Sequence, residues 1–323
     1  MSQLTFVYVV IFMAFVFDFV NGFHDAANSI ATLVSTKILK PLTAVLWAAF
    51  FNFIAFLFFD LHVANTLGVG LVDPSLVTPH IIFAGLCGAI LFNVITAYLG
   101  IPSSSSHALI GGLLGAMFTK HGLHSLIFSG VFKTLIAIII SPLLGVLLCI
   151  FLLFIINKFL HRYHHHFNKK LQLISAALLS LAHGGNDAQK TMGIIAVLLF
   201  SANILGDHFY VPLWVVISCN FVMAIGTFFG GWRIVKTIGE KITPLDAKDG
   251  AAVQTSSAII LFLTTHLGIP TSTTHTVTGS VTGAGIYKSD RPVNWKILKN
   301  IGNAWFLTIP CSAFVAGLIS FFV

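Results

Sequence analysis

Clustered hydroxyl side chains stand at two corresponding places in this sequence, each directly after a long apolar run. Residues 99–107 read LGIPSSSSH, and residues 267–275 read LGIPTSTTH. Proline ends an incoming helix because it has no backbone N–H to donate, and the Ser or Thr residues that follow are good N-caps for a returning helix. A helix N-terminus presents free N–H groups and a partial positive charge, which bind anions. The spacing therefore predicts two helical hairpins whose tips form an anion site.

The same hydroxyls could instead bond within their own helices or mediate helix contacts, which is common in membrane proteins. Two tips in corresponding places favour a ligand, since packing does not need the same sequence twice. His107 and His275 follow the hydroxyls by the same step. They could donate to the anion, relay a proton or simply pack, and the sequence leaves these roles open.

A second repeated motif contains acidic residues in apolar surroundings. Residues 21–31, NGFHDAANSIA, align with residues 183–193, HGGNDAQKTMG, so that Asp25 pairs with Asp187. Carboxylates at membrane depth are costly, and a cation partner is the natural explanation, although hydrogen bonds between helices would be another. We expect Asp and Asn oxygens, with exposed backbone carbonyls, to hold a hard monovalent cation, or a carboxylate to take a proton. Three glycines are expected to break the helices here and expose those carbonyls: Gly22, Gly184 and Gly185.

The composition indicates that these motifs belong to membrane-spanning helices. The chain has 323 residues, of which 57% are hydrophobic and 8% are charged, whereas soluble domains have roughly 25% charged residues. Apolar runs of roughly 17 to 25 residues recur, without the alternation of barrel strands. The formal net charge of +7 lies mainly in loops, as expected for membrane orientation. We therefore predict an all-α, polytopic membrane protein that contacts the lipid bilayer and no nucleic acid.

The chain also contains an internal repeat. Residues 99–116 and 267–284 are identical at nine of eighteen positions, and Asn52 aligns with Asn220. Lys and Arg fall in opposite loops of the two copies, so the copies are expected to be antiparallel in the membrane. Inverted repeats of this kind occur in secondary transporters, with binding sites near the midplane. The predicted units are a first repeat, a basic cytoplasmic linker and a second repeat, at 1–156, 157–170 and 171–323.

Each repeat is predicted to contain a broken helix, a straight helix, a re-entrant hairpin and a final helix. The crossings, in that order within each repeat, are residues 4–36, 42–59 and 126–156, then 171–200, 211–230 and 301–323. Six crossings, with the basic loops inside, place both termini outside. The linker contains His164, His165 and His166, which could bind metal. A solvated loop is favoured, because no carboxylate or cysteine accompanies them.

Together, the two motifs resemble the signatures of the inorganic phosphate transporter family, often called Pit. The likeness runs in order from Asn21 to Ala284. It implies secondary uptake of inorganic phosphate driven by a cation gradient, by alternating access, in the plasma (inner) membrane and as a homodimer, with no cofactor beyond the coupling ion. Carried over by position, the phosphate-binding residues would be Ser104, Ser105, Ser106, Ser272, Thr273 and Thr274. The residues for the coupling cation would be Asp25, Asn28, Asn186 and Asp187.

One position departs from the pattern of the sodium-coupled relatives. Where the first motif has Asn28, the second has Lys190, as in bacterial low-affinity members, whereas sodium-coupled relatives tend to repeat Asn. A lysine ammonium could take the place of a metal cation and pair with Asp187 or with phosphate. This departure favours H⁺ over Na⁺ coupling, and a Na⁺ ion at Asp25 and Asp187 is the alternative.

Other functions remain to be separated from phosphate symport. A cradle of amides and hydroxyls accepts sulfate as readily as phosphate, and phosphate can also travel as a complex with a divalent metal. An intramembrane hydrolase could use Ser106 beside His107, but adjacent helical residues do not face each other. No HExxH or GxSxG motif occurs. A purely structural scaffold would leave the duplicated aspartates unexplained, so we expect a transporter and not an enzyme.

Overall fold

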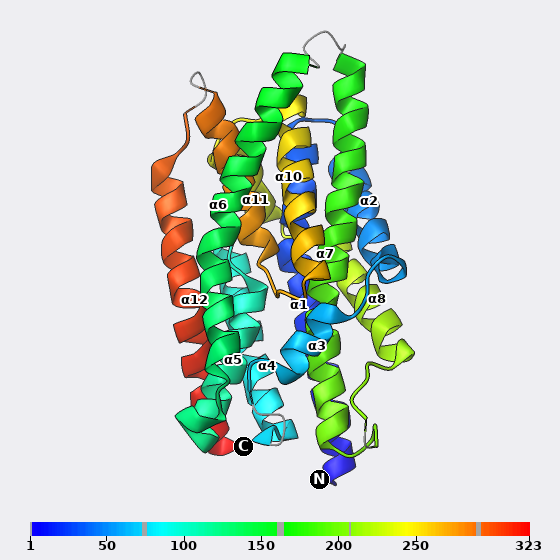
Figure 1. Cartoon of the computed structure of the whole chain (residues 1–323), viewed down its shortest axis with the longest axis vertical. Helices are drawn as coiled ribbons and strands as arrows, with labels where there is room; N and C mark the ends of the chain where they lie inside the picture. The colour runs from blue at the N-terminus through cyan, green and yellow to red at the C-terminus, as the bar shows by residue number, and fades with distance from the viewer. Residues whose placement is uncertain (1, 73–75, 160–164, 207, 289–291) are drawn as a thin grey trace.

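The computed structural model describes residues 2–72, 76–159, 165–206, 208–288 and 292–323. These residues form helices and short connections, and the only strand-like pairing among them is an isolated bridge between Val72 and Leu126. Figure 1 shows an elongated bundle in which both chain termini lie at the same end. The predicted all-α class is therefore confirmed.

The helices run along the chain in this order: α1 (Gln3–Ser35), α2 (Pro41–Ile54), η1 (Ala55–Leu57), α3 (His62–Val69), α4 (Pro79–Leu99), α5 (Ser105–His121), η3 (Leu123–Ser125), α6 (Phe128–Phe159), α7 (His165–Ser201), α8 (Leu213–Phe229), α9 (Trp232–Lys236), η4 (Thr237–Lys241), α10 (Ala247–His266), α11 (Thr273–Tyr287) and α12 (Trp295–Phe322). Among the described residues, α1, α4, α6 and α12 are long and apolar enough to cross a membrane, and α8 with α9 forms a bent fifth candidate.

Both predicted hairpins are present. Gly100 and Gly268 follow the incoming helices α4 and α10 in the left-handed conformation, with φ of 68° and 66°, which glycine adopts without steric cost. Ser104 and Ser272 then cap α5 and α11, each accepting a backbone N–H three residues further on at 3.2 Å. In Figure 1, α4 and α5 occupy the lower half of the bundle and α10 and α11 the upper half. The two tips therefore approach the middle from opposite ends.

The first element of each repeat differs from the prediction, because α1 and α7 are each one continuous α-helix. A Cβ atom on Gly22 would lie 2.2 Å from the carbonyl oxygen of Met223 in α8. One on Gly184 would lie 2.5 Å from the carbonyl oxygen of Asn52 in α2, and Gly185 packs on an aromatic ring. Small residues allow helix backbones in membranes to approach closely. The predicted breaks are therefore wrong: α1 and α7 continue through these glycines, which lie at close helix contacts.

The second element of each repeat is a helix, as predicted. The prediction of residues 42–59 is met by α2, which continues through η1 to Leu57, and the prediction of residues 211–230 is met by α8. A bend of 63° separates α8 from α9. Gly230, with φ of 65°, makes this turn possible. The bend therefore lies at the end of the predicted helix and not within it.

The ends of the predicted linker, residues 157–170, overlap two helices. α6 continues to Phe159 and α7 begins at His165, so the described part of the linker is mostly helical. His164 lies outside the described residues, and the structure places His165 and His166 only by their backbone, in the first turn of α7. The prediction of a solvated, metal-free loop for these histidines stays a prediction.

The two acid-bearing helices lie in the middle of the bundle. α1 packs mainly against α8, α4 and α7, and α7 packs mainly against α10, α2 and α3. Each therefore contacts helices from both halves of the sequence. The stretch of α1 from residue 24 to residue 33 is entirely buried, as is the stretch of α7 from residue 182 to residue 199. This packing brings the two acidic motifs together in the interior.

Candidate functional site

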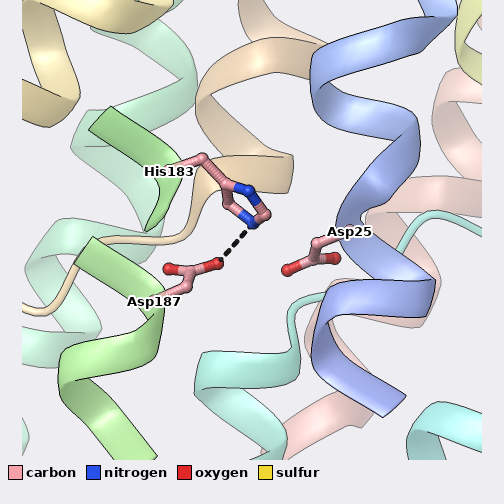
Figure 2. A group of neighbouring side chains, drawn as sticks. All are labelled: Asp25, His183 and Asp187. Atoms are coloured by element: carbon pink, nitrogen blue, oxygen red, sulfur yellow. Dashed lines mark ion pairs between the residues drawn. The ribbon is translucent and has the colours of Figure 1, made fainter. Parts of the chain in front are cut away.

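Asp25 on α1 and Asp187 on α7 point toward one another at the centre of the bundle (Figure 2). They are 2% and 0% exposed. His183 lies one turn before Asp187 on α7, and its Nε2 atom is 3.1 Å from Oδ2 of Asp187. One ligand atom from each of these three residues lies within 4.8 Å of the others. The predicted pair of acids is therefore brought together, with a histidine that the sequence analysis did not single out.

Both hairpin tips reach this pair of acids. The Ser105 hydroxyl at the start of α5 donates to Oδ2 of Asp25 at 2.8 Å. From the other hairpin, Thr274 donates to Oδ1 of Asp25 at 3.1 Å, and Thr273 lies 3.3 Å from both carboxylate oxygens of Asp187. Asp25 is thus held by two tips that come from opposite ends of the molecule.

Asn28 joins the first acidic motif to the second hairpin. It stands one turn after Asp25, and its Nδ2 atom donates to the Thr274 hydroxyl at 3.0 Å. The aligned residue in the other motif is Lys190, which donates to the Ser106 hydroxyl, the aligned counterpart of Thr274. Each motif therefore contacts the hairpin of the other half, through an amide in one case and an ammonium in the other.

The Lys190 ammonium is buried, with 1% of the residue exposed. Besides Ser106 it contacts a carboxylate oxygen of Asp187 and the backbone carbonyl of Thr271, the latter at 3.0 Å. A buried ammonium without an anionic partner costs several kcal/mol, which explains its position on Asp187. The fixed positive charge therefore joins α7 to both hairpin tips.

Not every predicted phosphate-binding hydroxyl faces the acids. Ser104 and Ser272 are used as N-caps of their own helices. Ser105, Ser106, Thr273 and Thr274 are the four that contact Asp25, Asn28, Asp187 or Lys190. All six hydroxyl residues are at most 3% exposed, so the structure shows the tips closed on the acids. Their role in phosphate binding stays a prediction.

The two predicted asparagines each leave an oxygen without a partner. Asn28 and Asn186 are 1% and 0% exposed, and the Oδ1 atom of each has no hydrogen-bond partner among the described residues. The Nδ2 atom of Asn186 donates to the Thr265 hydroxyl at 3.0 Å, which orients the amide. Buried polar atoms are normally bonded, so two orphan oxygens in the acidic motifs fit a cation or water ligand.

His107 and His275 meet each other behind the tips. Their ring centroids are 4.8 Å apart, and His275 stacks on Trp305 at 3.8 Å. Neither ring nitrogen of His107 has a hydrogen-bond partner among the described residues, and Nδ1 of His275 lies 3.4 Å from the carbonyl of Ile138. The structure therefore brings the predicted pair together, but places no hydrogen bond between it and the acids.

Two further residues of the first motif belong to the site. His24 lies with Nδ1 2.9 Å from Asp25, while its Nε2 is 3.2 Å from the Thr96 hydroxyl. The side-chain oxygen of Asn21, one turn before Asp25, lies 2.6 Å from the same Ser105 hydroxyl. Both are 1% exposed. In the sequence, His24 is a polar residue directly before an acid, and Asn21 is a polar residue one helical turn before the same acid. His183 precedes Asp187 by one helical turn in the same way.

The fold and the site define a polytopic helical membrane protein with a polar centre closed by two hairpin tips, an arrangement typical of membrane transporters. The chain belongs to the phosphate transporter family, which matches residues 21–316. Phosphate is the transported substrate of this family, and its members are transporters rather than enzymes. The resemblance found in the motifs is confirmed, and the intramembrane hydrolase is excluded.

Relatives and a solved structure match this chain over nearly its whole length. A protein of Rhizobium meliloti (strain 1021) named "Probable low-affinity inorganic phosphate transporter" is 55% identical, with 96% of this chain and 94% of that protein covered. A protein of Bacillus subtilis (strain 168) with the same name is 40% identical, with 98% and 96% covered. A structure described as "The sodium-dependent phosphate transporter" matches with a TM-score of 0.89 at 23% identity, covering 98% of each chain. This last match shows the shared fold.

Proposed function

We propose that this protein imports inorganic phosphate by symport with protons, through alternating access between the two sides of the membrane. Phosphate would bind between the tips, at Ser104–Ser106 and Ser272–Thr274, and the coupling site would include Asp25, Asn28, Asn186 and Asp187. The observation that supports this most directly is the Lys190 ammonium, which contacts Asp187, one tip hydroxyl and one tip carbonyl.

The charges of the site explain why an anion would need a coupled cation. Asp25 and Asp187 supply two negative charges, and Lys190 supplies one positive charge. In a water-excluded centre, opposite charges attract and like charges repel more strongly than in water. A phosphate anion would therefore be disfavoured beside the remaining carboxylate unless a proton or another cation entered with it. The helix N-termini of α5 and α11 would then supply N–H donors to the anion.

The position of Lys190 favours a proton as that cation. The Lys190 ammonium forms an ion pair with Asp187 and so takes the place that a second metal cation would otherwise have at this acid. At Asp25 the adjacent His24 nitrogen lies at 2.9 Å, and the carboxylate accepts hydrogen bonds from both tips. A carboxyl group in such a network can bind and release a proton without any change in coordination. His107 and His275 would form a relay beside it, a role their mutual contact permits.

Sodium coupling is the second candidate, and a specific observation favours it. The orphan Oδ1 atoms of Asn28 and Asn186 are suitable ligands for a hard cation beside Asp25 and Asp187. The trio of Asp25, His183 and Asp187 offers mixed oxygen and nitrogen ligands, which suit divalent transition metals better than Na⁺. That trio would be the place for the metal of a metal–phosphate complex, as part of the transported substrate.

The physiological setting follows from the same proposal. The relatives named as low-affinity phosphate transporters support a low-affinity role in the plasma (inner) membrane, with both termini outside and two copies forming a homodimer. The coupling ion would then be the only cofactor. Sulfate remains a competitor for the site, because both oxyanions are tetrahedral and accept the same N–H and hydroxyl donors.

Reconstitution into liposomes tests the proposal. Purified protein would be offered labelled phosphate or labelled sulfate under either an acid-outside pH gradient with equal Na⁺, or an inward Na⁺ gradient at equal pH. We expect phosphate to accumulate with the pH gradient and sulfate to compete weakly. Accumulation that follows Na⁺ and ignores the pH gradient would establish the second candidate instead, and preferential accumulation of sulfate would change the substrate.

A further inference from the structure

Asp18 is a third buried carboxylate, outside the pair of acids described above. It lies on α1 and is 0% exposed. Its Oδ1 atom is 2.8 Å from the Thr191 hydroxyl on α7, and its Oδ2 atom has no hydrogen-bond partner among the described residues. None of the ion pairs formed by the described residues includes Asp18. This acid therefore has a single neutral partner and no cation.

The surroundings of Asp18 strongly favour its neutral form. Phe17 on α1, Met192 on α7 and Cys219 on α8 belong to one buried hydrophobic cluster. A charged carboxylate there, without a cation, costs several kcal/mol, whereas a protonated carboxyl avoids this cost and its Oδ1 atom still accepts the hydrogen bond from Thr191. Burial without a cation therefore favours the protonated carboxyl in this closed arrangement, and contact with water would favour the carboxylate.

Packing does not explain why an acid stands here. The alignment of the two acidic motifs, continued along the uninterrupted helices α1 and α7, pairs Asp18 with Ser180 and Thr191 with Ser29. Ser180 is also 0% exposed, and its hydroxyl donates to the carbonyl of Ala176 at 2.9 Å. A small hydroxyl residue thus fills the equivalent place in the second half. The carboxylate is a difference between the halves, as Lys190 is.

We propose that Asp18 is the residue that takes up and releases the coupling proton. This inference rests on the proposed proton symport, and it assigns the coupling proton to the carboxyl group of Asp18. The carboxylate would accept a proton from water on the outer side, hold it while the site is closed, and release the same proton to water on the inner side.

The hydrogen bond to α7 links this proton to the phosphate site. Thr191 is one helical turn beyond Asp187 and directly follows Lys190. A movement of α7 against α1 would separate Thr191 from Asp18. If the tips open by such a movement, closing the site over phosphate would restore the buried, hydrogen-bonded setting that favours the protonated acid.

Few other titratable groups among the residues that the structure describes lie near this acid. From α7, the charge of Asp187 acts on Asp18, and from α8 the Cys219 thiol lies within range of its charge. From α4, His80 stacks on Phe6 near the N-terminal end of α1, with ring centroids 4.4 Å apart. Asp187 is paired with Lys190, and Asp25 is held by the tip hydroxyls and His24. Asp18 has neither an ion pair nor a tip contact, so it is the acid whose proton we follow.

The test compares two activities of one protein in liposomes: phosphate accumulation driven by an acid-outside pH gradient, and phosphate exchange at equal pH. Proton entry would be followed in parallel with a pH-sensitive dye inside the vesicles. In the Asp18→Asn variant we expect the ratio of driven uptake to exchange to fall at least tenfold, with loss of the phosphate-dependent proton signal. Asp18→Ser, which copies the residue of the second half, should behave in the same way, and Ser180→Ala is the matched control that keeps both activities.

The outcomes distinguish a failure of proton symport from a failure of the assignment to Asp18. If the unmodified protein ignores the pH gradient, proton symport itself fails, and with it the role of Asp18. If the unmodified protein responds and Asp18→Asn or Asp18→Ser also accumulates phosphate and admits protons at the normal ratio, only the assignment to Asp18 is overturned. Should Asp18→Asn not fold, as judged by a broad elution profile in detergent, the result for Asp18→Ser decides.

Discussion

The two halves of the central site are built from the same motif but stabilise their acids differently. Asp25 is held by hydroxyls from both hairpin tips and by the adjacent His24. Asp187 occupies the aligned place on α7, but its main partner is the Lys190 ammonium, where the first half has the neutral amide of Asn28. One acid therefore carries its own cation and the other does not.

This difference shows how a duplicated scaffold can acquire an asymmetric function. The contacts from each motif to the opposite hairpin are conserved between the halves, since Asn28 contacts Thr274 and Lys190 contacts Ser106. The geometry of closure is thus the same on both sides, while the charge is not. With one acid already neutralised, an anion at the tips requires fewer external cations than two free acids would.

Removing the ammonium should have the largest effect on stability. Lys190→Met leaves Asp187 buried without a cation, and we expect the free energy of unfolding to fall by about 3–5 kcal/mol. The aligned Asn28→Ala change removes one neutral hydrogen bond and should cost about 1 kcal/mol. Thermal unfolding of both variants in detergent measures the contrast. Acidic pH should reduce the loss in Lys190→Met, because protonation removes the unpaired charge on Asp187.

Equal losses in Lys190→Met and Asn28→Ala would show that the ammonium contributes no more than a hydrogen bond. Lys190 and Asn28 would then differ in the size of their side chains but not in an effect of charge on stability. Asp187→Asn extends the same test from the other side, because it leaves Lys190 as the unpaired group; it should also be strongly destabilised.

The acid without its own cation offers the next test. Asp25→Asn keeps the size of the side chain and removes its charge, so the protein should fold while phosphate uptake in vesicles falls roughly 10- to 100-fold, the equivalent of about 1.5–3 kcal/mol for a bond to a charged group. Size-exclusion chromatography provides the control for folding. Uptake at the unmodified rate would exclude Asp25 from the coupling site.

The sequence predicts the hairpins well because their signals are local. Pro102 and Pro270 end the incoming helices, and Ser104 and Ser272 cap the returning ones. The continuity of α1 and α7 is not local. A glycine such as Gly22 can mean a flexible backbone or a close contact, and the contact that decides, with the Met223 carbonyl, comes from a residue far along the chain.

The same distinction applies to the central site. Asp25, Asp187 and the tip hydroxyls are detectable because they occur twice in aligned places. His24 and His183 occur once each and align with an asparagine, so duplication does not reveal them. Asp18 is visible in the sequence as an acid in an apolar run, but its lack of a cation depends on the packing of α7 and α8.

The close helix crossings should respond alike in both halves, which tests the revised role of the glycines. Gly22→Ala and Gly184→Ala each place a methyl group within 2.5 Å of a backbone carbonyl oxygen. Such overpacking costs about 1–3 kcal/mol. Gly302→Ala in α12 is the matched control, since no atom lies within 4 Å of its added Cβ; it should be neutral or slightly stabilising. If Gly22→Ala and Gly184→Ala are as stable as that control, these glycines are not needed for close packing. Their role would then be to make the backbone of α1 and α7 flexible.

The smallest effect is expected at the end of the second hairpin away from its tip, where an ion pair joins the start of α10 to the end of α11. Lys288 Nζ lies 2.6 Å from Asp246, and both groups are partly exposed. Burial opposes the charge of Asp246, but the hydrogen bond from Lys288 and backbone N–H groups outweigh it and hold the pKa of this carboxyl below its usual value. Burial likewise opposes the charge of Lys288, and its carboxylate partners nevertheless raise its pKa.

Lys288 also lies 2.8 Å from the buried Asp249. Lys288→Gln should lower the free energy of unfolding by about 1 kcal/mol, because it removes the positive charge while the Gln amide can still donate a hydrogen bond to a carboxylate. A lowered carboxyl pKa gives stability that is present above the ordinary value of about 4 and is lost as the pH falls further. A raised lysine pKa gives stability that is present below about 10.4 and is lost as the pH rises beyond it. The difference in melting temperature between Lys288→Gln and the unmodified protein should be constant near neutral pH and shrink toward both extremes. A difference that does not change with pH would mean that Lys288 acts through packing and not through its charge.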